Sequence, residues 1–168
     1  RIFEAYQKLK RDNVDYILNL QGDEPMIEPK DIINLNDLMI KNNSDLGTLA
    51  SEIKEKKMFN NTNVVKVITK KKLQNNNFIK ALNFSRKYLY SENLNIYHHI
   101  GIYCYKVSVL KKFINLDQTK DEITNKLEQL RAISNGIEIN VALAETSPIG
   151  VDTIEDYLAL KKIMEYKS

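Results

Sequence analysis

The sequence predicts an α/β fold with a mixed, mainly parallel sheet, helices on both faces and an antiparallel excursion near the middle. Three observations lead to this prediction. Short apolar runs typical of buried strands alternate with segments of helical periodicity. Two strand-like runs in the middle are separated only by a polar turn. An acidic loop directly follows the first strand-like run, where open α/β sheets place their ligand-binding loops.

The first third of the chain has the order helix, strand, helix, strand. Apolar residues at helical spacing predict a helix up to Lys10, and the apolar run Tyr16–Leu20 predicts a strand. Pro29 suits a first helical position and predicts a helix that ends near Asn42. Leu46–Ile53 then predicts a short strand. A strand, a helix and a second strand form the unit that builds parallel sheets.

The middle of the chain predicts antiparallel strands. The runs Val64–Ile68 and Phe78–Phe84 are joined by a turn rich in Lys and Asn, which indicates a solvated hairpin. His99–Tyr105 alternates between polar or aromatic residues and apolar ones, as a strand in a sheet requires. Cys104 lies on the apolar face of this strand, and we expect it to be a small core residue.

The last third predicts a helix, a strand and a final helix. The first helix should begin at Asp121 and stop at Gly136, with an ion pair between Glu122 and Lys126. Ile137–Ala144 follows as a strand. Residues Thr153 and Asp156 then have the spacing of a capping box that opens the final helix.

Composition restricts the class of protein. A chain of 168 residues is long enough for one domain with a sizeable core, and we expect a single domain over residues 1–168. No apolar stretch approaches the ~20 residues needed to span a bilayer, and a formal charge of +3 is too small to indicate nucleic-acid binding. With Cys104 as the only cysteine, an internal disulfide is excluded and a reducing, cytoplasmic location is expected.

Two aspartates are the candidate metal ligands. Asp23 follows the strand Tyr16–Leu20, and Asp152 follows the last strand, so both should lie at the same edge of a parallel sheet. Asp23 is also next to Glu24, and neighbouring carboxylates repel unless a cation lies between them. Mg²⁺ with its preference for oxygen ligands would fit. The alternatives are a polar turn for the first site and a simple helix cap for Asp152.

Other polar residues are candidates for substrate binding. Ser85 and Arg86 end a predicted strand, where the guanidinium could bind a carboxylate or a phosphate. His99 lies on the polar face of its strand and is the better of two histidines for a site role. Glu128 and Gln129 flank an apolar helical stripe, so one of them should face a cleft. Solvated or hydrogen-bonded structural roles are the alternative for each of them.

Five segments together resemble one family. Asn19–Pro25, Asn83–Arg86, His99–Tyr103, Leu127–Arg131 and Gly150–Thr153 are similar, in order and spacing, to 3-deoxy-manno-octulosonate cytidylyltransferases, also called CMP-KDO synthetases. The resemblance implies a nucleotide-diphospho-sugar transferase-like (Rossmann-like) fold. It also implies transfer of CMP from CTP to an acidic eight-carbon sugar (KDO), with release of pyrophosphate, for the synthesis of lipopolysaccharide.

The resemblance also implies roles for individual residues. It implies a homodimeric enzyme in which Asp23 and Asp152 bind Mg²⁺ and take part in catalysis. Residues matched to the sugar-acid pocket are Gln21, His99, Glu128 and Gln129, with Ser85 and Arg86 at the same cleft. Arg1 matches the last residue of a Gly-Thr-Asp-Arg-like motif and would pair with the carboxylate of the substrate.

Two alternatives to this function remain open. The first is a cytidylyltransferase for another sugar acid, such as 8-amino-KDO or a relative of sialic acid. The second is a non-catalytic fragment of a split or decayed gene, which would need a separate amino-terminal fragment as its partner. Comparing several acids by pyrophosphate release would separate the first from KDO transfer, and mixing the two fragments would test the second.

The chain alone is expected to transfer no measurable CMP. Relatives begin with a strand and a glycine-containing loop whose Arg and Lys bind the CTP phosphates, and Arg1 lies after this segment. The chain also has neither a Gly-x-Gly-x-x-Gly nor a Gly-x-x-x-x-Gly-Lys-Ser/Thr loop to bind phosphates through backbone N–H groups. Turnover of CTP and KDO by the purified 168-residue chain would disprove this expectation.

Overall fold

The structure, a computed structural model, describes residues 1–9, 11–88, 91–147, 150–151 and 153–165. Its helices are α1 (Ile2–Leu9), α2 (Pro29–Asn42), α3 (Lys56–Asn60), α4 (Val107–Phe113), α5 (Lys120–Asn125), α6 (Gln129–Ser134) and α7 (Ile154–Glu165). Its strands are β1 (Tyr16–Leu20), β2 (Leu46–Ser51), β3 (Lys66–Thr69), β4 (Ile79–Ser85), β5 (Asn95–Lys106) and β6 (Ile139–Leu143).

These strands form one mixed sheet with the order β1-β5-β2-β6-β4-β3. Strands β1, β2, β3 and β6 run in one direction, whereas β4 and β5 run in the other. The α/β class and the mixed sheet are therefore confirmed. The prediction of a mainly parallel sheet is wrong, because most of the described strand pairings are antiparallel. The first β-α-β unit does place β1 and β2 in the same direction, but β5 lies between them, so among the described strands only β2 and β6 pair in parallel.

The 12-residue strand β5 connects most of the sheet. Its second half pairs with β1, its first half pairs with β3, and β2 pairs with it on the opposite side. In addition, β3 pairs with β4, β4 with β6, and β6 with β2. Strands β2, β3, β4, β5 and β6 therefore form a closed ring of pairings. Two residue pairs join β4 to β6, which makes this the shortest ladder of the ring.

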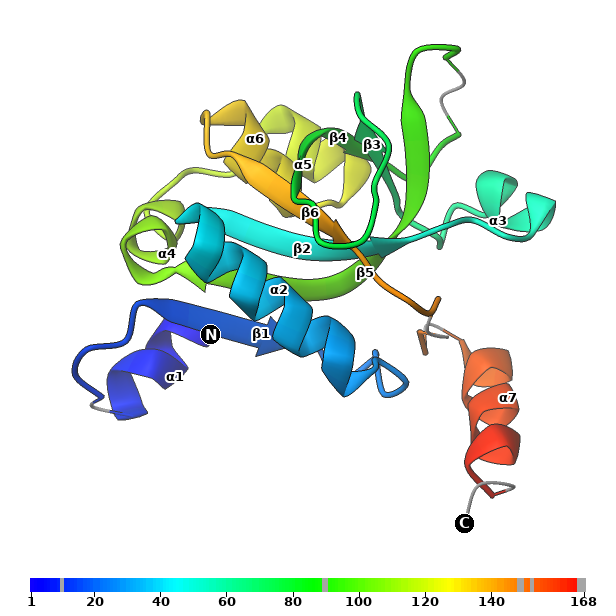
Figure 1. Ribbon diagram of the computed structural model, residues 1–168, viewed down its shortest axis with the longest axis horizontal. Coiled ribbons are helices and arrows are strands. Elements are labelled where there is room, and N and C mark those ends of the chain that lie inside the picture. The colour runs from blue at the N-terminus through cyan, green and yellow to red at the C-terminus, as the bar shows by residue number, and fades with distance from the viewer. Residues whose placement is uncertain (10, 89–90, 148–149, 152, 166–168) are drawn as a thin grey trace.

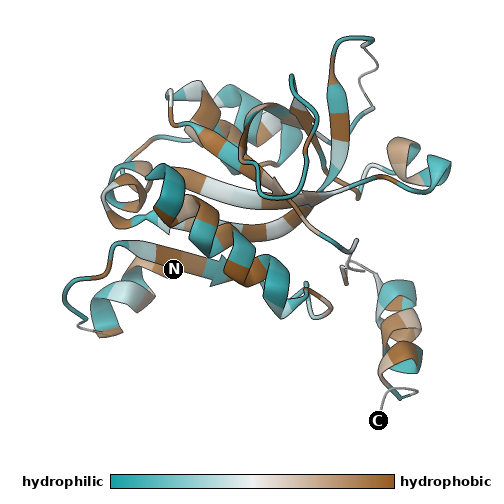
Figure 2. Ribbon diagram, in the orientation of Figure 1, coloured by the Kyte–Doolittle hydropathy of each residue, from teal (hydrophilic) through white to brown (hydrophobic). Residues whose placement is uncertain are grey.

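Helices cover both faces of the sheet, as predicted. On one face α2 packs Leu35, Leu38 and Met39 against strand residues that include Leu49 and Ile100. Figure 1 shows α2 lying across the sheet on this side, and Figure 2 shows apolar residues along the strands beneath it. On the other face, residues of α4 and α6 pack with those of β4 and β5, and α1 adds two partly buried residues.

The alternation predicted for β5 is confirmed, but both of its faces are buried. Ile100, Ile102 and Cys104 belong to the core under α2, whereas Tyr103 and Tyr105 belong to the core on the opposite face. Burial raises the pKa of the Cys104 thiol to about 11. This side chain is therefore an uncharged core residue, as predicted.

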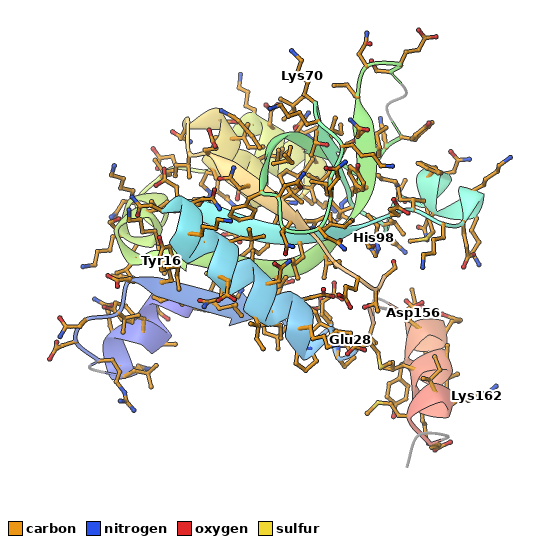
Figure 3. The ribbon with its side chains drawn as sticks, in the orientation of Figure 1. Tyr16, Glu28, Lys70, His98, Asp156 and Lys162 are labelled. Carbon is orange, nitrogen blue, oxygen red and sulfur yellow. The ribbon has the colours of Figure 1, made fainter. Side chains whose placement is uncertain are left out.

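Local signals at helix starts were predicted correctly. Pro29 is the first residue of α2. At the start of α7, the Thr153 hydroxyl accepts the N–H of Asp156 at 3.2 Å, and an Asp156 carboxylate oxygen accepts the N–H of Thr153 at 2.9 Å. The hairpin of β3 and β4 is also present, and Lys70 at its turn is exposed and points outward (Figure 3).

The helix predicted between Asp121 and Gly136 is wrong as a single element. It is broken into α5 and α6, because Lys126 adopts the left-handed conformation with φ 53° and ψ 48°. The expected Glu122–Lys126 ion pair is also wrong, since the Glu122 carboxylate pairs with Arg131 instead. Helices α3 and α4 were not predicted.

None of the helices within the described residues is both long and apolar enough to cross a membrane.

Close packing of β2 against α2 leads to a first prediction. A Cβ atom at Gly47 would lie 2.5 Å from the Met39 sulfur, 2.8 Å from Phe78 Cζ and 3.1 Å from Leu35 Cδ1. Since these side chains must shift, Gly47→Ala should lower the free energy of unfolding by about 1–3 kcal/mol. Urea denaturation would measure this change. Gly22→Ala is the control, because no atom lies within 4 Å of its Cβ position, and an equal loss in both variants would contradict the packing argument.

Candidate active site

A cleft of about 1040 Å³ lies where β1, β2 and β6 end, against residues 98–105 of β5. Its walls come from the loops that follow these strands, from the turn between α5 and α6, and from the start of α7. Figure 3 labels two residues of this lining, His98 on β5 and Asp156 on α7. This location agrees with the general rule that α/β sheets bind ligands beyond the carboxyl ends of their strands.

Most of the residues selected from the sequence lie in this cleft. Those that line it are Gln21, Asp23, Arg86, His99, Glu128 and Gln129. Arg1 and Ser85 are not part of its lining. Arg1 is exposed at the start of the chain, and Ser85 is buried with its hydroxyl accepting the N–H of Lys87 at 3.0 Å. Asp152 lies outside the described residues, so its predicted meeting with Asp23 stays a prediction.

A bulge in β5 fixes the loop that follows β1. Thr48 of β2 pairs with Tyr103, but the next residue, Leu49, pairs with Ile100, so Gly101 lies in the shifted part of the register. Its N–H donates to the Glu24 carboxylate at 3.0 Å. A Cβ atom at Gly101 would lie 2.7 Å from the Gln21 side-chain oxygen. The two adjacent carboxylates of the loop therefore have different surroundings. That of Glu24 accepts the backbone N–H of Gly101, whereas Asp23 is exposed in the cleft.

The segment between β6 and α7 is attached to this loop. The N–H of Val151 donates to the Asp23 carbonyl oxygen at 2.9 Å, so residues distant in sequence meet at the cleft. Two further contacts hold the start of the segment. The buried Asp31 carboxylate accepts the N–H of Glu145 at 3.0 Å, and His98 Nδ1 lies 3.2 Å from the Ser147 hydroxyl. Burial raises the pKa of Asp31.

His99 is buried and neutral. Its Nε2 lies 2.9 Å from the Thr48 hydroxyl, which also contacts the Ile102 carbonyl at 2.7 Å. Because that hydroxyl has one proton to donate to the carbonyl, we assign the imidazole proton to Nε2, from which it donates to Thr48. Burial, followed by the neighbouring His98, lowers the pKa of His99 to about 3. The ring also makes an edge contact with Phe84, with centroids 5.1 Å apart. His99 therefore supplies a fixed, uncharged ring beside the cleft.

A buried ion pair supports Glu128 and Gln129. Glu122 closes a capping box with Thr119 and binds Arg131 through both carboxylate oxygens. The Arg131 guanidinium lies over the Phe113 ring, 4.8 Å from its centroid, and also 3.2 Å from the Glu128 carboxylate. Hydrogen bonds from Arg131 hold the pKa of Glu122 below its usual value. This bidentate pair fixes the α5–α6 turn, on which Glu128 is exposed and Gln129 is buried at the cleft wall.

Arg86 contacts backbone carbonyls on two segments. Its guanidinium donates to Thr62 at 3.1 Å and Asn63 at 3.5 Å, and on the other side to Asn125 at 3.3 Å and Lys126 at 3.4 Å. The sequence had suggested a carboxylate or a phosphate as its partner. In the structure, this guanidinium connects the loop before β3 with the α5–α6 turn.

Sequence reasoning missed Lys66 beside the site. This fully buried side chain donates to the carbonyls of Asn61 at 2.6 Å and Arg86 at 2.8 Å. Burial, together with the nearby Arg86, lowers its pKa. A lysine in the middle of the apolar run Val64–Ile68 was a signal for this, because lysine is rarely buried without partners.

Comparison with known proteins identifies the relatives of the chain. The cytidylyltransferase family model matches residues 1–139. A 3-deoxy-manno-octulosonate cytidylyltransferase from Bartonella bacilliformis is 39% identical over 165 residues, which cover 98% of this chain and 67% of that protein. The namesake from Thermodesulfovibrio yellowstonii is 41% identical over 98% of this chain and 68% of that protein.

Solved structures agree with these relatives. A CMP:2-keto-3-deoxy-manno-octonic acid synthetase complexed with CTP matches with a TM-score of 0.82 at 30% identity, over 98% of this chain and 66% of that one. A 4-diphosphocytidyl-2C-methyl-D-erythritol synthase from Anaerococcus prevotii, at 14% identity and a TM-score of 0.51, shares the fold alone. The chain belongs to the cytidylyltransferase family. Within it, the relatives named above are 3-deoxy-manno-octulosonate cytidylyltransferases, and the chain spans about two thirds of their length.

The neutral state of His99 leads to a prediction about pH. An unfolded histidine has a pKa near 6.5, whereas that of folded His99 is about 3, so the unfolded state binds the extra proton between these values. The contribution of His99 to the free energy of unfolding is therefore fully present above pH 6.5 and decreases as the pH falls below this value. Between pH 7 and pH 5 it should account for a decrease of about 2 kcal/mol in the free energy of unfolding.

Denaturant titrations of the wild type and of His99→Gln across this pH range would measure the effect. The variant should have the flatter dependence on pH. Burial also lowers the pKa of His98, but His98 contributes to both curves, so their difference isolates His99. Curves with the same slope would contradict a buried neutral His99.

Proposed function

We propose that this protein transfers CMP from CTP to 3-deoxy-manno-octulosonate and releases pyrophosphate. The observation that carries the proposal is the alignment of the chain, over 98% of its length, with relatives of that name. The cleft supports it, since Asp23, Glu128 and Gln129 all line it. The match to a synthetase complexed with CTP supports the nucleotide part of the reaction.

The proposed chemistry is an in-line displacement at the α-phosphorus of CTP. The anomeric hydroxyl of the sugar acid loses its proton to solvent and its oxygen forms a bond to this phosphorus, while the bond from phosphorus to the bridging oxygen of the pyrophosphate breaks and pyrophosphate leaves. Such a reaction needs no covalent protein nucleophile, but it does need two reactants held in line. Gln129 and Glu128 can hydrogen-bond sugar hydroxyls from the α5–α6 turn, and Gln21 can do so from the loop after β1.

The proposal includes one Mg²⁺ ion. Asp23 presents an exposed carboxylate to the cleft, and we propose that it holds the ion together with Asp152. Two carboxylates are enough for Mg²⁺, which usually takes one or two and fills its other positions with water and substrate phosphates. When bound, the ion supplies neutralisation of the phosphate charge.

We also propose a cytoplasmic homodimer, and sedimentation of the purified protein would test its oligomeric state.

Binding and turnover test the proposed function separately. Calorimetric titration of the chain with 3-deoxy-manno-octulosonate, N-acetylneuraminate and the 8-amino sugar acid should give the tightest binding for the first. Pyrophosphate release is then followed with CTP and Mg²⁺. It is measured for the chain alone and after mixing with a polypeptide that carries the part of the Bartonella relative that the chain does not span. Failure to bind the first acid, or a preference for another, would overturn the proposed substrate.

A substitution tests the proposed role of Asp23. Asp23→Asn keeps the shape of the side chain but removes its charge, so Mg²⁺-dependent transfer by the chain mixed with that complementary polypeptide should fall by about 100-fold or more. Binding of the sugar acid should change little, since the change concerns the metal. Asp37→Asn, an exposed position on α2 outside the cleft, is the matched control. Measurable and equal turnover by the two variants, each mixed with the complementary polypeptide, would rule out metal binding by Asp23.

A further inference from the structure

Lys126 occupies an unusual backbone conformation in the cleft wall. It ends α5 with φ 53° and ψ 48°, in the left-handed region that glycine adopts easily and that other residues adopt at a cost. Lys126 is exposed and is one of the residues that line the cleft, two residues before Glu128. A glycine would satisfy the backbone at this position, so the lysine side chain requires a separate explanation.

Contacts from Arg86 support this conformation. The guanidinium donates to the carbonyls of Lys126 and Asn125 from one side of the wall, while its other contacts reach Thr62 and Asn63. The carbonyl of Arg86 itself accepts a hydrogen bond from buried Lys66 at 2.8 Å. The charge of Arg86 is thus directed at the protein backbone, and its side chain fixes the turn that presents Lys126.

The charges of the cleft leave few cations for an anionic ligand. The lining contains more acidic than basic side chains, so an anion needs a local positive charge to enter. Among the basic residues of the lining, Arg86 binds carbonyls, and Lys57 pairs with Glu55 at 2.7 Å. Lys54 and Lys126 make no ion pair within the described part of the chain. Of these two, Lys126 lies on the turn that carries Glu128 and Gln129.

We propose that Lys126 binds the carboxylate of the sugar acid and helps the site to select an acidic sugar, with Arg86 as its positioning residue. This inference rests on the proposed function and adds to it a residue that determines specificity. The ammonium group of Lys126 pairs with the carboxylate, while Glu128 and Gln129 hydrogen-bond the hydroxyls of the same sugar.

A thermodynamic cycle tests the pairing. Calorimetry would measure the binding of 3-deoxy-manno-octulosonate and of its carboxamide, which lacks the charge, to the wild type and to Lys126→Gly. The wild type should bind the acid about 10-fold more tightly than the carboxamide, as expected for a charge-assisted hydrogen bond. In Lys126→Gly this preference should disappear, whereas Lys126→Arg should retain it.

Stability separates this role from a structural one. Lys126→Gly relieves the backbone strain, so its Tm should rise by about 2–4 °C while its affinity for the acid falls. Asn76→Gly is the matched control, because Asn76 also has a positive φ of 63° but does not line the cleft. It should bind the acid as the wild type does. A lower Tm together with weaker binding in Lys126→Gly would mean that the lysine only supports the fold, and would overturn the proposal.

Arg86→Lys tests the positioning role. Lysine retains the charge but lacks the planar guanidinium that donates both to the loop before β3 and to the α5–α6 turn. The Arg86→Lys substitution should therefore weaken binding of the acid when Lys126 is present and have no further effect when it is combined with Lys126→Gly. If Arg86→Lys weakens binding equally in both backgrounds, Arg86 acts independently of Lys126 and the positioning role is wrong.

The remaining outcomes distinguish this inference from the proposed function. If the wild type does not bind the sugar acid, both fail. If it binds the acid with full preference over the carboxamide and Lys126→Gly does the same, only the role of Lys126 fails. Weaker binding of CTP, with unchanged binding of the acid, would assign the lysine to phosphate and also overturn the inference.

Discussion

The bulge at Gly101 is the constraint on which the geometry of the cleft depends. It moves one N–H out of the regular β5 ladder, and Glu24 accepts this N–H, which fixes the loop after β1. The same loop binds the segment after β6 through the Asp23 carbonyl. On the other side of the bulge, the Thr48 hydroxyl bridges His99 and the carbonyl of Ile102. A change of register at this point would thus move residues from three strands together.

Local features of the fold could be predicted from the sequence, but features that depend on distant residues could not. Pro29 and the Thr153–Asp156 capping box mark helix starts through contacts within one turn. In contrast, nothing in the periodicity indicates that β5 lies between β1 and β2. The break at Lys126 also depends on distant partners, because Arg86, which directly follows β4, holds the turn. The pattern around it is otherwise helical, which explains the wrong prediction.

The same contrast between local features and features set by distant residues applies to the candidate site. Asp23, His99, Glu128 and Gln129 line the cleft. The sequence had indicated them through the ends and faces of predicted elements and through the resemblance to one family. Neither signal indicated the environment of each side chain. Arg86 was expected to contact an anion, but its partners are carbonyl oxygens, which every residue carries and which no sequence motif marks. Burial likewise decides that His99 is uncharged, and burial depends on the complete packing around it.

The ring of strand pairings described above leaves the edges of the sheet unequal. Strands β2 to β6 each have a neighbour on both sides over at least part of their length, whereas β1 pairs with β5 alone among the described strands. Its other side pairs with no described strand, and Leu20 is exposed at its end. Such an edge can receive an added extended segment. Self-association by strand addition would accordingly begin at β1, and a proline introduced there would be the most direct means of preventing it.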